Sequence, residues 1–258
     1  MMFKRTCPRL IPFDVLFEEC RSPHTELDCI TVAVSLYNYD KFIIECLESI
    51  HEQTHRNIDL IVVDDCSTTS APVDVVTGWM KEHHDRFRRT TLLRHRRNQG
   101  LAEARNTAFF HARTDPVFVM DADNQIYPRA LSKLYEFVQF REYDAAYTQL
   151  EFFGEERRLG YADFWDKGRF RYGNYVDAMA LISRSAWEEV GGYSHVQGGW
   201  EDYEFWCKFI EAGMKAAYVP QILCRYRVHG TSMLRTDTAA NHDRIRIEMI
   251  MRHPWLQI

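Results

Sequence analysis

Two aspartates separated by one residue follow a short apolar run in the segment VFVMDADNQIYP, residues 117–128. The run Val117–Met120 predicts a buried strand, which would place Asp121 and Asp123 at the carboxyl end of that strand. Two carboxylates at one point suit Mg²⁺ or Mn²⁺, which proteins hold with few carboxylates and complete with phosphate oxygens and water. Taken alone, the pattern is also typical of a strand that ends in a turn, because Asp and Asn favour turns.

A second pair of aspartates, Asp64 and Asp65, follows the apolar run Leu60–Val63. Ligands of open α/β sheets bind where the strands have their carboxyl ends, so both pairs are expected at one edge of the sheet. For Asp64 a structural role is expected, as a cap or as a support for its neighbours.

Glu201 and Asp202 stand at the start of a predicted helix, in the segment GGWEDYEFW. The helix dipole favours negative charge in the first turn, so Asp202 is expected to be ionised at neutral pH and able to accept a proton. The alternative is that both residues are simply first-turn acids, which stabilise a helix without taking part in a reaction.

From Ile30 onward, short apolar runs alternate with stretches of helical periodicity. The expected strands are Ile30–Leu36, Leu60–Val63, Thr91–Leu93 and Val117–Met120, and the expected helices are Lys41–Gln53, Val73–His84 and Leu101–Ala112. Alternation at this rhythm predicts an α/β fold with right-handed crossovers and a mostly parallel sheet.

The second half of the chain has a less regular pattern. It predicts a helix near Ala130–Phe140, strands near Ala145–Phe153 and Val176–Ile182, a short helix from Ser185, a helix from Glu201, a strand pair at Lys215–Val219 and Leu223–Val228, and a final helix from about Asp237. Residues 154–175 are expected to be rich in loops. The final helix mixes Ile and Met with Arg, and packing against the sheet is favoured over contact with a membrane.

Residues 1–26 carry three prolines, mixed charge and no sustained period, which indicates a leader or linker. Residues 27–258 are expected to form a single domain, and a chain of this length can bury a sizeable core. The chain could also be one piece of a longer polypeptide with neighbouring domains.

The composition argues against several classes of protein. A formal net charge of −5 leaves no broad basic surface for a nucleic-acid partner. No run approaches the roughly 18–20 apolar residues of a membrane span, and a signal-peptide core is missing, so the chain is expected to be cytoplasmic, with peripheral contact at the inner face of a membrane left open. Seven scattered cysteines without a CxxC pair fit neither a disulfide framework nor a zinc site.

Six segments occur in an order that matches one enzyme family. They are VAVSLYNYDKFIIECLESIHEQT (32–54), DLIVVDDCST (59–68), NQGLAEARNTAF (98–109), VFVMDADNQIYP (117–128), VGGY with GGWEDYEFWCKFIEAG (190–213), and YRVHGTS (226–232). Together, over roughly residues 30–232, the sequence resembles the family 2 inverting glycosyltransferases of GT-A fold.

The resemblance implies a fold and a set of roles. The fold is a mostly parallel central sheet flanked by helices, with a small antiparallel part near the acceptor side. A nucleotide-sugar donor, UDP-linked by default, would be bound by Ser35, Tyr37, Asp65, Gly100, Arg105 and Asp121. A divalent metal, Mn²⁺ or Mg²⁺, would be held by Asp123 and His229, and Asp202 would be the catalytic base. Trp200 and Glu201 would meet the acceptor, which is a sugar, a polysaccharide or a lipid-linked saccharide.

Several of these roles have structural alternatives. Arg105 could instead pair with Glu103 or Asp65, and Trp200 could be a core residue. The basic run Arg94–Arg97 is expected to be a solvated loop rather than a diphosphate site. The glycine-rich loop 191–199 could flex over the site.

Two other functions compete with sugar transfer. A catalytically silent nucleotide-sugar-binding or scaffolding domain would have no reason to retain Asp123, Asp202 and His229 together. A sugar-phosphate nucleotidylyltransferase would need a glycine-rich, lysine-bearing loop after the first strand, and SLYNYDKF has no such loop.

Overall fold

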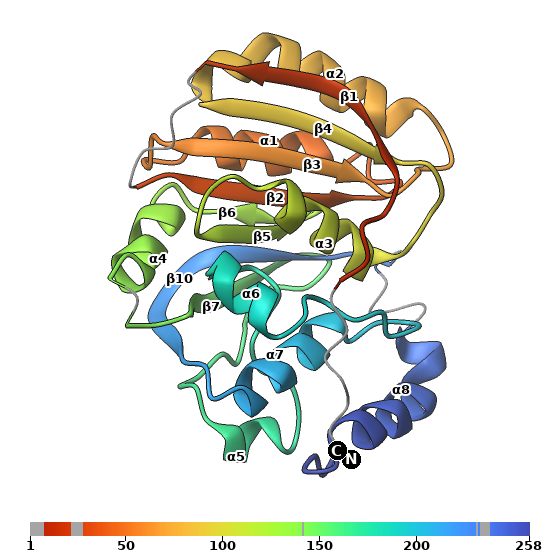
Figure 1. Cartoon of the computed structure of the whole chain (residues 1–258), viewed down its shortest axis with the longest axis vertical. Helices are drawn as coiled ribbons and strands as arrows, with labels where there is room; N and C mark the ends of the chain where they lie inside the picture. Colours follow the sequence, from red (N-terminus) through yellow and green to blue (C-terminus); the bar gives the residue numbers. More distant parts are fainter. Residues whose placement is uncertain (1–7, 22–27, 141, 231, 233–237) are drawn as a thin grey trace.

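Four parallel strands form the first part of one mixed sheet (Figure 1). The computed structural model describes residues 8–21, 28–140, 142–230, 232 and 238–258. The strands are β2 (Ile30–Leu36), β3 (Ile58–Asp64), β4 (Arg89–His95) and β5 (Val117–Asp121), in the spatial order β4-β3-β2-β5. Every residue of β2 and β3 is buried, as expected for parallel strands covered on both faces. The four predicted strands are therefore confirmed, each within a few residues of its expected ends.

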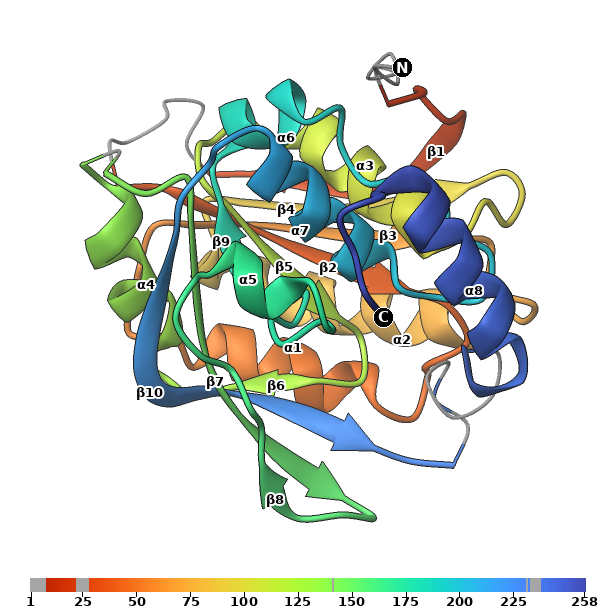
Figure 2. The same ribbon diagram turned by 90° about the horizontal axis from the view of Figure 1, so that it is seen from below.

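Helices cover both faces of this sheet. The first face carries α1 (Ile43–His51), α2 (Ala71–His83) and α4 (Ala130–Val138), and a 3₁₀ turn, η1 (His84–Arg86), follows α2. The opposite face carries α3 (Leu101–His111), α6 (Arg184–Glu189), α7 (Glu201–Glu211) and α8 (Ala239–Arg252). Figure 2 shows α7 and α8 on the same side of the sheet as α3. Nearly all of α3 is buried, including four polar side chains in its middle.

The rest of the chain adds a part of the sheet with mixed strand directions. The remaining strands are β6 (Gln125–Ile126), β7 (Ala145–Gly154), β8 (Arg158–Leu159), β9 (Ala180–Ile182) and β10 (Ala216–Val228). Strands β7 and β10 are parallel to each other. Strand β9 lies antiparallel between β5 and β7, and β6 and β8 are antiparallel to β10 and β7. The expected strand pair at 215–228 is one strand, β10, whose register against β7 shifts between Val219 and Cys224.

The region 154–175 is loop-rich, as expected, apart from β8 and the single-turn helix α5 (Lys167–Phe170). The final helix α8 packs through Ile245 and Met249, while Ile247 and Met251 are 57% and 70% exposed. Across the described part of the chain, no helix has the length and apolar character needed to cross a membrane.

An edge strand occupies residues that were predicted to be leader or linker. Strand β1 (Phe13–Cys20) pairs antiparallel with β4 at the end of the sheet. Its side chains are mostly exposed, so the segment has no buried period that the sequence could reveal. The prediction for residues 13–20 was therefore wrong, and residues 1–7 and 22–27 lie outside the described part of the chain.

Candidate active site

A cavity of about 1530 Å³ opens where the parallel strands have their carboxyl ends. Every residue that the sequence predicted to meet the donor, the metal or the acceptor, or to act as the base, lines this cavity. They are Ser35, Tyr37, Asp65, Gly100, Arg105, Asp121, Asp123, Trp200, Glu201, Asp202 and His229. Pockets for one small ligand usually measure about 300–1,000 Å³. The cavity therefore has room for two substrates side by side.

The carboxylate of Asp65 accepts hydrogen bonds from the surrounding chain at one end of the cavity. Its Oδ1 accepts a hydrogen bond from the backbone N–H of Gln99 at 2.9 Å, and its Oδ2 accepts one from Gly100 at 2.7 Å. The Nδ1 atom of His95 lies 2.7 Å from the same Oδ1. The carboxylate thus holds the start of α3, and one acceptor position of Oδ2 remains for a ligand N–H. Tyr37, at the same end, is 40% exposed.

The neighbouring Asp64 is fully buried and has the structural role that was expected. It accepts hydrogen bonds from the backbone and side chain of Ser67, and Arg94 Nε lies 3.4 Å from Oδ2. Burial raises its pKa, and the bonds from Ser67 and the charge of Arg94 oppose that rise.

The basic run at 94–97 was expected to be a solvated loop, but only part of it is solvated. Arg94 and His95 end strand β4, and His95 is buried between Asp65 and the hydroxyl of Thr107 at 2.8 Å. Arg96 forms an exposed ion pair with Asp14 of β1. Buried carboxylates at the edge of the sheet need partners, and this run supplies them.

Arg105 pairs with Asp121. The partners considered from the sequence were Glu103 and Asp65, so this pair was not predicted. The Nη2 atom of Arg105 donates to both carboxylate oxygens of Asp121, at 2.9 and 3.2 Å. Only 3% of Arg105 is exposed, and its guanidinium lies 5.3 Å from the ring centre of Tyr193. Burial alone would lower the pKa of Arg105, but Asp121 and the other nearby acidic groups raise it. Asp121 is therefore held in one orientation beside the cavity.

Asp123 and His229 form the second polar pair on the cavity wall. The Nε2 atom of His229 lies 2.9 Å from Oδ2 of Asp123, and both residues are buried. The rings of Tyr39 and Phe42 pack on His229, with centroids at 5.6 and 4.9 Å. Burial and the charge of Asp121 raise the pKa of Asp123, while His229 opposes that rise.

This pair fits a divalent cation that takes most of its ligands from substrate. A carboxylate oxygen and an imidazole nitrogen are both donors for Mn²⁺. Among the residues that the structure describes, no group of three or more His, Cys, Asp or Glu side chains is close enough to hold a metal. Diphosphate oxygens and water would have to complete the coordination.

Asp202 lies in the first turn of α7, and its Oδ2 accepts a hydrogen bond from Asn174 at 2.8 Å. Burial raises its pKa, with the charge of Arg105 as the main opposing cause. The helix dipole and the charge of Arg105 favour the ionised form of Asp202, and burial acts against both. A raised pKa makes the carboxylate a better proton acceptor once it is ionised.

Two further carboxyl groups share this part of the cavity. Glu201 is 4% exposed, and burial raises its pKa to about 7. Asp177, for which the sequence predicted no role, also lines the cavity, and burial raises its pKa to about 7 while it accepts a bond from the N–H of Met179 at 2.8 Å. A charged residue inside the predicted apolar strand 176–182 was the signal that could have revealed it.

Trp200 has a backbone conformation that bulky residues rarely adopt, with φ of +69°. It is the N-cap of α7, and its ring contacts Tyr203 and His242 at centroid distances of 5.8 and 5.5 Å. The half-buried ring therefore both packs on its neighbours and lines the cavity. Strain of this kind is found where the surroundings fix a functional geometry, and Trp200 directly precedes Glu201 and Asp202.

The sequence model of Glycosyl transferase family 2 matches residues 31–191 of this chain. This chain belongs to glycosyl transferase family 2. Its relatives in the family include the glycosyltransferase GlyG of Streptococcus pneumoniae, 24% identical over 232 residues, which cover 81% of this chain and 74% of GlyG. Another is the UDP-Glc:alpha-D-GlcNAc-diphosphoundecaprenol beta-1,3-glucosyltransferase WfaP of Escherichia coli, 22% identical over 216 residues and 80% of each chain.

Solved structures of other proteins share the fold. TarS of S. aureus, in complex with UDP, has a TM-score of 0.65 at 18% identity, covering 87% of this chain and 71% of that one. The mannosyltransferase PcManGT of Pyrobaculum calidifontis, in complex with GDP-Man and Mn²⁺, has a TM-score of 0.65 at 24% identity, covering 87% and 62%. The chain is a glycosyltransferase of GT-A fold, as the resemblance implied.

Proposed function

We propose that this glycosyltransferase moves a sugar from a nucleoside-diphosphate sugar to an acceptor hydroxyl with inversion at the anomeric carbon. The observation that carries the proposal is the cavity itself, on which the Asp123–His229 pair and Asp202 lie together. The named ligands of TarS and PcManGT, which are UDP, UDP-GlcNAc and GDP-Man, support a nucleotide-sugar donor.

The donor is proposed to lie along the edge of the sheet. Ser35, Tyr37 and Asp65 would hold the nucleoside, with Gly100 beside it, and Asp121, fixed by Arg105, would meet the ribose. Asp123 and His229 would hold a divalent cation, Mn²⁺ or Mg²⁺, which stabilises negative charge on a departing diphosphate. UDP is the default donor nucleotide.

Asp202 is proposed to be the general base. As the acceptor oxygen bonds to the anomeric carbon, the bond from that carbon to the diphosphate breaks, and a carboxylate oxygen of Asp202 takes the hydroxyl proton. The hydrogen bond from Asn174 fixes the orientation of the carboxylate. Attack on the face opposite the leaving group needs no enzyme nucleophile and inverts the configuration.

The acceptor is proposed to occupy the part of the cavity next to Trp200 and Glu201. A sugar ring can stack on the exposed part of the indole ring. The acceptor class is a sugar, a polysaccharide or a lipid-linked saccharide in polysaccharide or glycoconjugate synthesis. WfaP, whose name specifies a diphosphoundecaprenol-linked acceptor, supports the lipid-linked choice and with it a cytoplasmic protein with peripheral contact at a membrane. Residues 27–258 are proposed to act as one domain.

A donor-turnover assay tests this function. The protein would be incubated with Mn²⁺ and a panel of UDP- and GDP-sugars, with and without saccharide acceptors, and the released nucleoside diphosphate measured. Replacing Asp202→Asn should lower turnover by about 10²–10⁴-fold, because the base is lost, and should leave nucleotide binding intact. Turnover that is unchanged in Asp202→Asn would contradict the role of Asp202. Nucleotide binding without turnover for any donor would favour the silent binding domain.

A further inference from the structure

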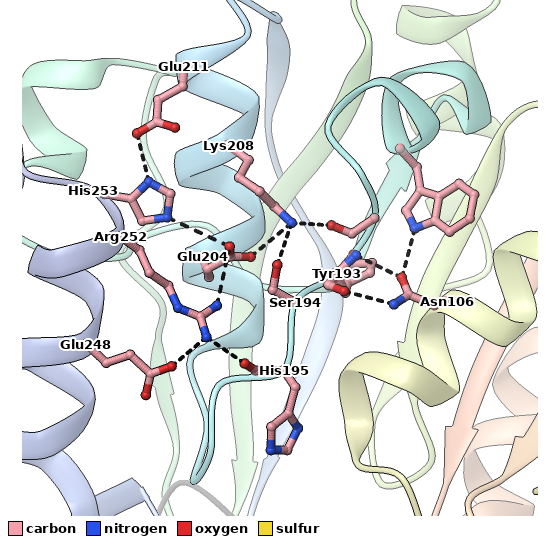
Figure 3. A network of polar contacts seen from close by, with 12 residues as sticks. Asn106, Tyr193, Ser194, His195, Glu204, Lys208, Glu211, Glu248, Arg252 and His253 are labelled. Carbon is pink, nitrogen blue, oxygen red and sulfur yellow. Dashed lines mark hydrogen bonds and ion pairs between the residues drawn. The ribbon is translucent and has the colours of Figure 1, made fainter. Parts of the chain in front are cut away.

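The loop 191–199, for which flexing over the site was one possibility, is held by side chains from three helices (Figure 3). From α3, Asn106 bonds to both the N–H and the carbonyl of Tyr193, each at 2.8 Å. From α7, Lys208 donates to the carbonyl of Gly192 and, at 2.9 Å, to the hydroxyl of Ser194. These bonds hold the backbone of the loop, which forms one wall of the cavity.

Helix α8 fixes the middle of the same loop. Arg252 donates from Nη2 to the carbonyl of His195 at 2.9 Å and to Glu248 at 2.5 Å, and its Nη1 lies 3.6 Å from Glu204 of α7. Thr238, at the start of α8, donates to the carbonyl of Gly198 at 2.7 Å. The backbone of His195 is therefore held by an arginine that two glutamates keep in place.

The side chain of His195 has a different environment from its backbone. It is exposed and lines the cavity, and in Figure 3 its ring points away from Arg252 and the ion pairs. Within the described residues neither ring nitrogen has a hydrogen-bond partner. The ring lies so close to Gly100 that a Cβ atom at position 100 would be 3.1 Å from Nδ1.

Gly100 places this ring at the nucleoside end of the cavity. The N–H of Gly100 bonds to Asp65, and Tyr37 lines the cavity with them. Gly100 therefore contacts both the imidazole of His195 and the carboxylate of Asp65, which is proposed to hold the nucleoside. A neutral imidazole, with one donor and one acceptor nitrogen, can distinguish the hydrogen-bonding groups on the edges of different bases.

We propose that His195 contacts the nucleobase of the donor and contributes to the choice of that base, and that Arg252 positions it. This inference rests on the proposed nucleotide-sugar donor. A contact to the base predicts an effect that differs among nucleotides, whereas a contact to ribose or phosphate predicts an equal effect on all of them.

Calorimetric titration of the whole protein with UDP, CDP, TDP, GDP and ADP, each with Mn²⁺, tests the inference. We expect His195→Ala to weaken binding of the preferred nucleotide by about tenfold, the effect of one lost hydrogen bond, and to weaken the others less. Arg252→Gln should act in the same direction by a smaller factor. His55→Ala, whose ring bonds to the carbonyl of Asp28 on the surface, is the matched control and should change nothing.

His195→Phe separates hydrogen bonding from packing, because it keeps a ring against Gly100 without the nitrogens. It should lose selectivity as His195→Ala does, and a variant that kept wild-type selectivity would overturn the inference. An equal loss for all five nucleotides, or no loss, would also overturn it while leaving the proposed function in place. If the wild-type protein bound no nucleotide, the proposed function and this inference would fall together.

Discussion

Four carboxyl groups lie around one buried arginine at the centre of the site. Asp121 pairs with Arg105 directly. The charge of Arg105 also lowers the pKa values of Asp177, Glu201 and Asp202, against the effect of burial. One guanidinium cannot neutralise four carboxyl groups that are buried or partly buried, and burial raises the pKa values of Asp177, Glu201 and Asp202. Asp177 and Glu201, with pKa values of about 7, therefore keep bound protons up to near neutral pH.

The effect of burying a carboxyl group on the stability of the fold can be measured at Glu201. Burial raises the pKa of its carboxyl group from the ordinary value of 4.5 to about 7 in the folded protein, so its contribution to stability is fully present below pH 4.5 and is lost as the pH rises through 7. We expect Glu201→Gln to raise the free energy of unfolding at pH 8 by up to about 3 kcal/mol, with little effect near pH 4.5. Urea denaturation at the two pH values measures this. Equal stability of variant and wild type at pH 8 would show that burial does not raise the pKa of Glu201.

At the scale of the elements, one buried charge adds a side-chain contact to the backbone pairing between β1 and β4. Arg89 of β4 is almost completely buried, and its guanidinium pairs with Glu18 of β1. Glu18→Gln should destabilise the fold by about 1–2 kcal/mol, because the arginine stays buried without its ionic partner. Asp14→Asn on the same strand removes an exposed pair with Arg96 and should cost less than about 1 kcal/mol. Similar costs for the two variants in denaturant unfolding would contradict this account of β1.

The fixed loop 191–199 gives a second prediction at this scale. Gly199 has φ of +124°, and a Cβ atom there would lie 2.4 Å from the hydroxyl oxygen of Thr238. Gly213 also has a positive φ, +74°, but open space around it. Gly213→Ala should cost about 1–2 kcal/mol for the backbone alone, and Gly199→Ala should cost clearly more. If thermal unfolding ranked the two in the opposite order, the loop would not be packed as tightly as its contacts indicate.

The sequence predicted the elements whose side chains are buried in a regular pattern. Strands β2 to β5 were predicted from short apolar runs rich in β-branched residues, and helices α1 to α3 from the stretches of helical spacing between those runs. The edge strand β1 was not predicted because its exposed side chains leave no such pattern. Strand β10 was predicted as two strands, and its pairing with β7 is irregular at the point of division, between Val219 and Cys224.

For the site, the sequence predicted which residues gather but not what each contacts. The order of the motifs predicted that Asp65, Asp123 and Asp202 would share one site, and all three line the cavity. The partners of Arg105 and His95, and the presence of Asp177 and His195 on the cavity wall, depend on contacts between distant segments. Local patterns do not record such contacts, so only the folded chain shows them.

At the scale of the whole molecule, one sheet brings together residues from Ser35 to His229. Strand ends and the loop before α3 supply the proposed donor end, and α7 with its preceding loop supplies the proposed base. A cavity of about 1530 Å³ between them can hold donor and acceptor together. The central claim is therefore that a nucleoside diphosphate binds here with a divalent cation.

Thermal unfolding of the protein with UDP, GDP, CDP, ADP or TDP, each with and without Mn²⁺, tests that claim most directly. A ligand at a hundred times its dissociation constant stabilises by about 2.7 kcal/mol, which is about 5–10 °C for a chain of this size. We predict such a shift for one nucleotide, dependent on Mn²⁺ and lost in Asp123→Ala. No shift with any nucleotide, or a metal-dependent shift that persists in Asp123→Ala, would contradict the donor site described here.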